Sequence, residues 1–232
     1  MDERLRQKAM SVQLPLGVQL RDSATFASFH SAHNRQLLTA LKETRETCVY
    51  FWGKAGTGKS HLLQALCHEK AGEGWRVAYL PLAEPDLMPA MLDDMDQFDL
   101  ICVDDLHYVA GKKDWEIALF HCYNRIQTRA GRLVISANQA PPSLPIGLPD
   151  LASRLGWGLV FQFHELADED KQAALQLRAQ ARGLDLSDEV AAYLLRHAPR
   201  DMSSLFSLLE RLDKASLAAQ RKLTIPFVRQ FI

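Results

Sequence analysis

Eight consecutive residues, Gly53 to Ser60, are the part of this 232-residue chain best suited to chemistry. They read Gly-Lys-Ala-Gly-Thr-Gly-Lys-Ser and fit the phosphate-binding pattern G-x-x-x-x-G-K-[ST]. The glycines let the backbone curl so that successive N–H groups point at a polyphosphate, and a following helix adds positive potential. We expect Lys59 to reach the β- and γ-phosphates and the Ser60 hydroxyl to ligate Mg²⁺. The expected phosphate-binding set is Gly53, Lys54, Ala55, Gly56, Thr57, Gly58, Lys59, Ser60 and the next residue, His61.

A pair of acids follows an apolar run further along the chain. Residues 98–103 are mostly apolar and lead directly into Asp104 and Asp105. Such a run predicts a buried strand that places Asp104 at its carboxyl end, where it can hold Mg²⁺ through water in the manner of a Walker B motif. Asp105 is then placed to polarise an attacking water. Two adjacent acids are also common at the start of a solvated loop. The phosphate-binding pattern in the same chain favours the interpretation as a Mg²⁺-binding strand end.

Three more polar residues are candidates for contact with phosphate. Asn138 follows the apolar run 132–137 and can sense a γ-phosphate or orient water, although asparagine there is also a common turn former. Arg154 lies in a short helical pattern, 150–155, and can stabilise phosphoryl-transfer charge in cis or across a subunit contact. Arg200 precedes a C-terminal helical pattern and can reach back to the phosphates. The alternative for both arginines is an ordinary surface charge.

The elements that must position these residues alternate between strand-like and helix-like patterns from Thr25 to about Glu165. This alternation predicts an α/β domain with a parallel sheet covered on both faces. The helix pattern is clearest in Trp115, Ala118, Leu119, Cys122 and Ile126, while residues 139–149 contain several prolines and predict a surface loop. We expect strands at 48–52, 75–80, 98–104, 132–137 and 158–163.

The strand signal disappears after Asp168, and three helical patterns follow. The sequence therefore predicts residues 23–165 as an α/β nucleotide-binding domain and residues 166–232 as a small all-helical lid domain. Residues 1–22 mix charges with a short apolar insert and are expected to form a flexible tail.

Composition excludes several classes of protein. The chain is 47% hydrophobic and 24% charged with a formal net charge of −1, so it lacks the basic excess of a protein that grips DNA by itself. It has no apolar stretch long enough to cross a membrane and no signal-like start, so we expect a cytoplasmic protein without a membrane partner. The four cysteines form no C-x-x-C pair and are expected to be buried free thiols. They are Cys48, Cys67, Cys102 and Cys122.

Taken in order, these pieces resemble an AAA+ ATPase, and within that superfamily the ATPase module of the bacterial replication initiator DnaA. The matching stretches are Phe26 with Phe29 and Asn34, the phosphate loop, Asp104-Asp105 and residues 153–158. The initiator continues into a helix-turn-helix domain and has an N-terminal domain, whereas this sequence stops at Ile232 and begins with a short tail. In this it is similar to the Hda family of DnaA-related regulators, which it resembles most in residues 148–155, 168–171 and 219–228.

The resemblance implies a function. Members of that family bind adenine nucleotide, ATP or ADP with Mg²⁺, and the DNA-loaded sliding clamp, and they trigger hydrolysis of the ATP held by DnaA. Re-initiation of replication is thereby prevented. Carried over by position, Arg154 becomes the finger inserted into the initiator's ATP site and Arg200 the lid residue that touches this chain's own nucleotide. Phe26, Phe29 and Asn34 lie near the adenine pocket, DNA is contacted indirectly through the clamp, and a homo-oligomer is expected.

Two departures from the family pattern bear on these expectations. The clamp-binding peptide of the family reads Gln-Leu-Ser/Asp-Leu-Pro-Leu, and the aligned residues here are Ser11, Val12, Gln13, Leu14, Pro15 and Leu16, so Ser11 replaces the leading glutamine. Asp105 stands where many AAA+ ATPases have glutamate. We therefore expect a slow or silent ATPase whose nucleotide serves mainly as a structural switch.

Two other classes of function stay open at this point. An autonomous AAA+ ATPase that loads a helicase or remodels nucleic acid would show DNA-stimulated turnover and would use Arg154 in its own ring. A small-molecule kinase would need a lid whose arginines converge on a substrate. The candidates for such a lid are Arg178, Arg182, Arg196, Arg200 and Arg211, but their spacing does not place them on one face.

Overall fold

The computed structural model describes Phe26, residues 33–43 and residues 46–232. They divide into two compact units. The first contains Gln36–Gly53 and Lys59–Phe163, and the second contains Lys54–Gly58 and His164–Ile232 together with the described residues before Gln36. The phosphate loop thus contributes residues to both units. No helix in the described part of the chain is both long and apolar enough to cross a membrane.

The first unit is built on a five-stranded parallel sheet with the order β2-β3-β4-β1-β5. Its strands are β1 (Cys48–Trp52), β2 (Val77–Pro81), β3 (Leu100–Asp104), β4 (Arg132–Ala137) and β5 (Leu159–Gln162). The three central strands are almost fully buried, as a sheet covered on both faces requires. The predicted fold is confirmed.

The predicted starts of β2 and β3 are too early. The structure starts β2 at Val77 and β3 at Leu100, directly after Arg76 and Asp99. These two residues form an ion pair of 2.9 Å between Nη2 and Oδ1, and the Arg76 amide donates to the Asp99 carboxylate at 2.8 Å. The Asp99 amide donates to the Arg76 carbonyl at 2.8 Å, so main-chain and side-chain bonds together join the chain just ahead of the two strands.

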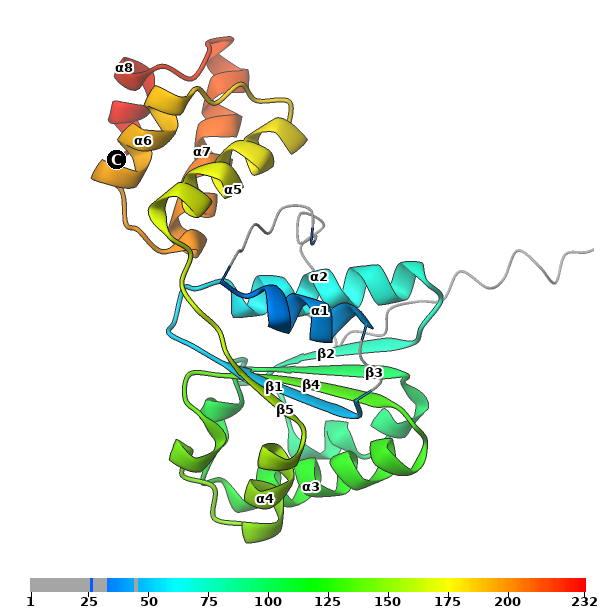
Figure 1. Cartoon of the computed structure of the whole chain (residues 1–232). Helices are drawn as coiled ribbons and strands as arrows, with labels where there is room; N and C mark the ends of the chain where they lie inside the picture. Colours follow the sequence, from blue (N-terminus) through cyan, green and yellow to red (C-terminus); the bar gives the residue numbers. More distant parts are fainter. Residues whose placement is uncertain (1–25, 27–32, 44–45) are drawn as a thin grey trace, which may run out of the picture. The chain divides into compact units, whose positions relative to one another are not determined.

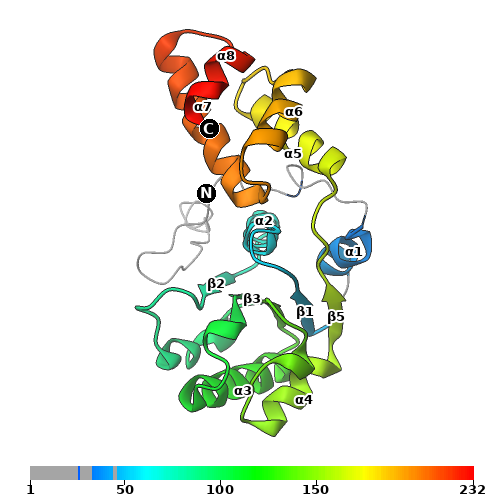
Figure 2. The same ribbon diagram turned by 90° about the vertical axis from the view of Figure 1, so that its left-hand side faces the viewer.

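Helices cover both faces of the sheet (Figure 1). On one face lie α1 (Arg35–Glu43) and α2 (Lys59–Gly72), and on the other lie α3 (Lys113–Thr128) and α4 (Pro149–Trp157). Figure 2 shows α2 end-on above the strands and α3 with α4 beneath them. The predicted apolar face of α3 packs into this core through Leu119, Cys122 and Ile126. All four cysteines are buried free thiols, as predicted.

Short 3₁₀ turns occur in the connections of the first unit. They are η3 (Pro89–Leu92), η4 (Met95–Gln97), η5 (Leu106–Tyr108) and η6 (Pro141–Ser143). The proline-rich segment 139–149, predicted as a surface loop, contains η6 and buries both Pro141 and Leu144. Pro149 then opens α4, where its missing N–H costs no hydrogen bond.

The second unit is all-helical and has its own core. Its helices are α5 (Asp168–Ala181), α6 (Asp188–His197), α7 (Met202–Ala219) and α8 (Ile225–Val228), followed by the 3₁₀ turn η7 (Arg229–Phe231). The sequence predicted three helical patterns, and the structure adds the short α8. Side-chain caps begin two of the helices, because Ser187 accepts a hydrogen bond from the Val190 amide and Asp201 accepts one from the Ser204 amide.

Candidate functional site

The phosphate loop starts at Gly53, where only glycine fits. Its amide donates to the Ala137 carbonyl at 3.1 Å, and a Cβ atom at this position would lie 2.5 Å from the Phe163 carbonyl oxygen. Lys59, at the start of α2, is 5% exposed, and its ammonium donates to the Gly53 carbonyl at 2.9 Å. Burial lowers the pKa of Lys59, while the negative charges of Asp105 and Asp104 oppose that shift. The lysine is therefore held within the loop and faces two carboxylates.

The middle of the loop belongs to the second unit. The Thr57 hydroxyl donates to the Lys54 carbonyl at 2.9 Å, which closes a tight turn. Gly56 has a φ of 75°, and a Cβ atom there would lie 2.7 Å from the Asp201 Cβ atom. The Gly56 carbonyl accepts a hydrogen bond of 3.2 Å from the Met202 amide. Only glycine satisfies both the backbone angle and this close approach.

Asp104 lies at the carboxyl end of β3, where the sequence placed it, and is 2% exposed. Tyr79 on β2 donates its hydroxyl to the Asp104 carboxylate at 2.7 Å, and the Ser136 hydroxyl on β4 donates to the other carboxylate oxygen. Gln64 on α2 donates in turn to the Tyr79 hydroxyl at 3.2 Å. Burial and the adjacent Asp104 carboxylate raise the pKa of Tyr79, so its hydroxyl remains a donor. This network fixes the carboxylate in one orientation.

Sequence reasoning missed Tyr79 and Ser136. Both are polar residues inside otherwise apolar strands, and the sheet order places β2 and β4 on either side of β3. A hydroxyl in each strand that flanks an acid-ending strand is a signal that could have found them, because buried polar groups need hydrogen-bond partners.

Asp105, the next residue, has a left-handed backbone with φ 58° and ψ 47°. Its amide donates to the Ser136 hydroxyl at 3.0 Å. Burial raises the pKa of Asp105 to about 6, and the charge of Asp104 adds to this shift while Lys59 opposes it. A carboxyl group with a pKa in this range can accept a proton near neutral pH. His107 lies nearby, with 3.9 Å between its Nδ1 atom and Asp105 Oδ1, and burial lowers the pKa of that imidazole.

Two other predicted residues lie at the same end of the strands. Asn138 directly follows β4 and its side chain is exposed. His61, in the first turn of α2, is half-buried.

Arg154 lies on α4 and is half-buried. Its guanidinium carbon is 4.7 Å from the centroid of the Trp157 ring and 5.7 Å from that of the Tyr123 ring. Trp157 is itself 69% exposed. Within the part of the chain that the structure describes, no carboxylate lies within ion-pair distance of Arg154. Aromatic rings hold its charge without neutralising it.

Glu116 on α3 braces the loop that leads into α4. This carboxylate is 3% exposed and accepts hydrogen bonds from main-chain amides at Gly111 (2.7 Å), Gly147 (3.0 Å) and Leu148 (2.8 Å). Glu116 was not singled out from the sequence. An acid next to the apolar face of a predicted helix could have indicated a buried carboxylate that needs hydrogen-bond donors. Because α4 begins at Pro149, the brace determines where the helix starts.

Of the predicted lid and adenine-pocket residues, the structure describes Arg200, Asn34 and Phe26, which belong to the second unit. The Arg200 guanidinium is 3.9 Å from an Asp168 carboxylate oxygen, and both side chains are exposed. The Asn34 amide group donates to the His164 carbonyl at 2.9 Å and accepts from the His164 amide at 2.8 Å. Asn34 therefore holds the main chain at the start of the segment leading into α5. Phe26 is half-buried, while Phe29 and the predicted clamp-binding peptide, residues 11–16, lie outside the described residues.

Two side chains close to Lys59 in the chain or in the sheet could act as ligands of a hard cation such as Mg²⁺. The Ser60 hydroxyl and the Asp104 carboxylate offer oxygen ligands, which Mg²⁺ prefers. No group of three or more His, Cys, Asp or Glu side chains that could hold a metal occurs among the residues given a structure. These two side chains would hold Mg²⁺ only together with waters and phosphate oxygens.

Comparison with known proteins agrees with this architecture. Residues 24–162 match the model of the bacterial DnaA ATPase domain, and residues 168–232 match the model of the Hda lid domain. Domain III of the Thermotoga maritima replication initiation protein DnaA superposes with a TM-score of 0.79 at 20% identity, covering 93% of this chain and 98% of that chain.

Two further structures share the fold with lower TM-scores. AMPPCP-bound DnaA from Aquifex aeolicus has a TM-score of 0.70 at 22% identity, covering 86% of this chain and 67% of that chain. A RuvB mutant from Thermotoga maritima has a TM-score of 0.66 at 13% identity, covering 90% and 71%. The fold is thus shared with proteins whose sequences have diverged widely.

Proposed function

Because the chain belongs to the family of the bacterial DnaA ATPase domain and ends in an Hda-type lid, we propose that it regulates replication initiation in trans. It binds adenine nucleotide and, together with the DNA-loaded sliding clamp, stimulates hydrolysis of the ATP held by the initiator DnaA. The initiator is left in its inactive ADP form, which prevents re-initiation.

Nucleotide binding is supported by the phosphate loop and the acids beside it. Lys59 supplies a buried positive charge, and Gly56 and Gly58 give the loop the positive φ angles that allow its N–H groups to point at a phosphate. Asp104 and the Ser60 hydroxyl would hold Mg²⁺, which neutralises phosphate charge when bound. Burial, and to a smaller extent the charge of Asp104, raises the pKa of Asp105, and a bound divalent cation would offset the negative charge of the two acids.

The observation that carries the proposal is the state of Arg154. It lies on a helix whose preceding loop is held by Glu116, its guanidinium lies against two aromatic rings, and no carboxylate within the described ranges pairs with it. An arginine kept charged and positioned in this way suits insertion into the ATP site of a partner, where it stabilises charge on the transferred phosphoryl group. We assign it as the finger that completes the initiator's catalytic site.

The test is a reconstituted reaction. Initiator loaded with labelled ATP is mixed with DNA-loaded clamp and this protein, and ADP formation is followed over time. We expect acceleration that requires both the clamp and this protein. Arg154→Ala is expected to reduce it by about 10³-fold, because the variant loses transition-state charge stabilisation.

A matched control separates the finger from general loss of charge. Arg211 is an exposed arginine on α7, and Arg211→Ala removes the same side chain from a different surface. It is expected to leave the acceleration unchanged. If Arg154→Ala loses nucleotide affinity as much as activation, the trans assignment is wrong.

The clamp contact is assigned to residues 11–16, which keep the apolar anchors of the family peptide but begin with Ser11. Deleting residues 1–16 is expected to weaken binding to the clamp without changing the thermal unfolding of the rest of the chain. An unchanged clamp affinity would count against this tail.

An autonomous ATPase that loads a helicase is the second candidate, and the Asp105 carboxyl favours it. With a pKa of about 6 and a place beside Asp104 and Lys59, this group can accept a proton from water at neutral pH. DNA-stimulated turnover by this chain alone, abolished in Arg154→Ala, would assign the arginine to its own ring instead.

A further inference from the structure

The C-terminal stretch of the second unit carries unbalanced positive charge. Residues 214–232 include Lys214, Arg221, Lys222 and Arg229 but no aspartate or glutamate. Buried or partly buried cations elsewhere in this unit are paired, namely Lys171 with Glu165, Arg178 with Glu210 and Arg182 with Asp213. Arg221 and Lys222 are exposed and form no ion pair with any residue that the structure places. Their charges are therefore open to an external anion.

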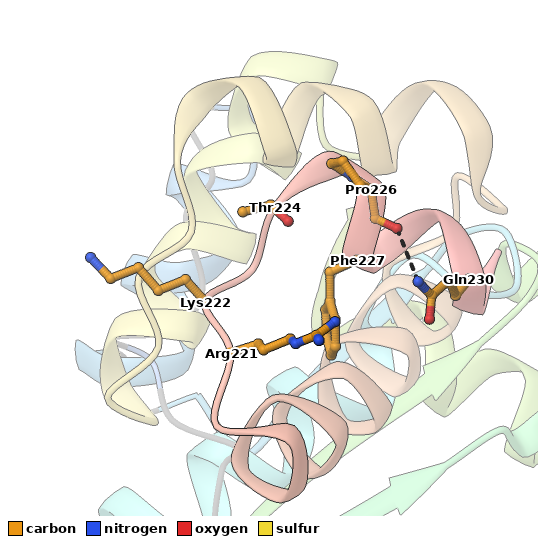
Figure 3. Close-up of a pocket in the computed structure, with 6 residues that line it drawn as sticks. All are labelled: Arg221, Lys222, Thr224, Pro226, Phe227 and Gln230. Carbon is orange, nitrogen blue, oxygen red and sulfur yellow. Dashed lines mark hydrogen bonds between the residues drawn. The ribbon is translucent and has the colours of Figure 1, made fainter.

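These two cations line a shallow cavity of about 280 Å³ in the second unit (Figure 3). Its lining residues are Arg221, Lys222, Thr224, Pro226, Phe227 and Gln230. The Phe227 ring is 8% exposed and packs on Phe231 with 5.4 Å between centroids, so it forms a fixed apolar wall. In Figure 3 the Arg221 side chain runs alongside Phe227. A cation beside an apolar wall suits an apolar side chain with a carboxylate next to it.

The backbone at Arg221 is fixed. Gln220 ends α7 in a left-handed conformation with φ 51°, which turns the chain out of the helix. The Arg221 amide then donates to the Ser216 carbonyl at 3.1 Å, and the Ser216 hydroxyl donates to the Arg221 carbonyl. With both main-chain groups bonded, only side-chain rotations remain to be ordered when a ligand binds, which lowers the entropic cost of binding.

A segment of matching chemistry occurs in the first unit of the same chain. No lysine or arginine occurs between Arg76 and Lys112, and within that stretch residues 82–97 form an acidic connection. Its exposed acids Glu84, Asp86, Asp93 and Asp94 form no ion pair with the described residues. Arg125 reaches this segment, but it donates to the Leu92 carbonyl at 2.6 Å and leaves the carboxylates unneutralised.

The acidic segment also exposes apolar surface. Met88 is 65% exposed and Met91 is 37% exposed. They are three residues apart at a 3₁₀ turn, and side chains at this spacing lie on the same face. Flexible thioether side chains adapt well to irregular hollows.

We propose that the cavity around Arg221 binds the acidic segment 82–97 of a second copy of the chain. The cavity volume suits one or two side chains, since sites for whole small molecules are typically about 300–1,000 Å³. A methionine of the segment packs on Phe227 while a neighbouring carboxylate pairs with Arg221 or Lys222. The contact joins two different surfaces, the cavity of one copy and the acidic segment of the other.

The test is a charge swap in the full-length chain. One variant carries Arg221→Glu with Lys222→Glu, and the other carries Glu84→Lys with Asp86→Lys. All four residues are exposed, so neither variant removes a buried contact. Sedimentation velocity at low ionic strength, where screening is weak, measures self-association. We expect the wild-type chain to associate, each variant alone to associate at least about tenfold more weakly, and an equimolar mixture of the two to recover association.

One control variant and four possible outcomes decide between this contact and its alternatives. Arg229→Glu reverses an exposed charge outside the cavity lining and is expected to change association less than about twofold. A wild-type chain that stays monomeric, a mixture of variants that does not recover, or an equal effect of Arg229→Glu would each overturn the proposal. Duplex DNA bound by the wild type and lost in the Arg221 variant would assign the cavity to nucleic acid instead. The phosphate loop and Arg154 are untouched in every variant, so activation of the initiator is measured independently.

Discussion

Asp104 and Arg154 are both charged residues of the first unit, but their surroundings are opposite. Asp104 is 2% exposed and both of its carboxylate oxygens accept hydrogen bonds from hydroxyls of neighbouring strands. Arg154 is half-buried, rests on aromatic rings and has no carboxylate partner among the residues described. The first group is completed by its own chain, and the second is the one that we propose for insertion into the ATP site of another molecule. A charge with all its hydrogen bonds made inside the chain and a charge held by aromatic rings therefore suit different roles.

The largest expected effect on ligand binding tests the internal side of this comparison. Lys59→Ala removes the one buried lysine of the phosphate loop and is expected to weaken adenine nucleotide binding by about tenfold to a hundredfold, the strength of charged hydrogen bonds. Equilibrium binding of a fluorescent nucleotide measures this. Arg154→Ala should leave that affinity unchanged, and a loss in both variants would erase the distinction between the two regions.

The second prediction concerns Glu116, which holds the loop before α4. Glu116→Gln places an amide N–H₂ group against main-chain N–H donors and is expected to lower the free energy of unfolding by about 2–3 kcal/mol. Urea denaturation gives the value. Glu189→Gln changes an exposed carboxylate at the start of α6 in the same way and serves as the control, with a smaller expected loss. Equal losses of unfolding free energy in the two variants would show that the hydrogen bonds of Glu116 to the loop do not stabilise the fold more than an exposed carboxylate does.

A pH-dependent effect sharpens the comparison at Asp105. Its pKa is raised from 3.8 to about 6, so the folded chain holds a proton that the unfolded chain releases between these values. Ionised Asp105 therefore destabilises the nucleotide-free fold above about pH 6, and this cost is absent below about pH 4. Asp105→Asn is expected to raise the unfolding free energy by about 1–2 kcal/mol at pH 8 and to change little at pH 4. A gain independent of pH would contradict this account.

The smallest expected effect concerns the aromatic support of Arg154. Trp157→Ala removes the nearer ring, and a cation–π contact at an exposed site contributes about 0.5–1 kcal/mol. Activation of the initiator should fall about twofold to fivefold, while the midpoint of thermal unfolding stays the same. Trp157→Phe keeps a ring and should retain most of the activity. If the two substitutions behave alike, stacking does not position the arginine.

Much of the fold was predictable from local patterns. The loop from Gly53 to Ser60 is recognised by its glycines and by a lysine at fixed spacing. The apolar run ending in Asp104 predicts a buried strand of a parallel sheet with the acid at its carboxyl end. Both patterns depend on residues close together in the chain. For the same reason the strands 48–52 and 132–137 are predicted to the residue.

The remainder depends on contacts between distant segments. Tyr79 and Ser136 reach Asp104 only because the sheet order places β2 and β4 beside β3. Glu116 reaches main-chain amides more than 30 positions away, and no spacing rule indicates that. The roles of Asn138 and Arg200 stay predictions, since both side chains are exposed.

The way in which Glu116 holds the loop before α4 bears on how this protein can change through evolution. The carboxylate binds backbone N–H groups and no side chain of residues 139–148. A Cβ atom added at Gly147 would meet Glu116 at 3.5 Å, an ordinary van der Waals distance. Substitutions in this loop should therefore be tolerated as long as the amides of Gly147 and Leu148 are kept, which excludes proline there. The placement of Arg154 is thereby insulated from sequence drift in the segment that precedes it.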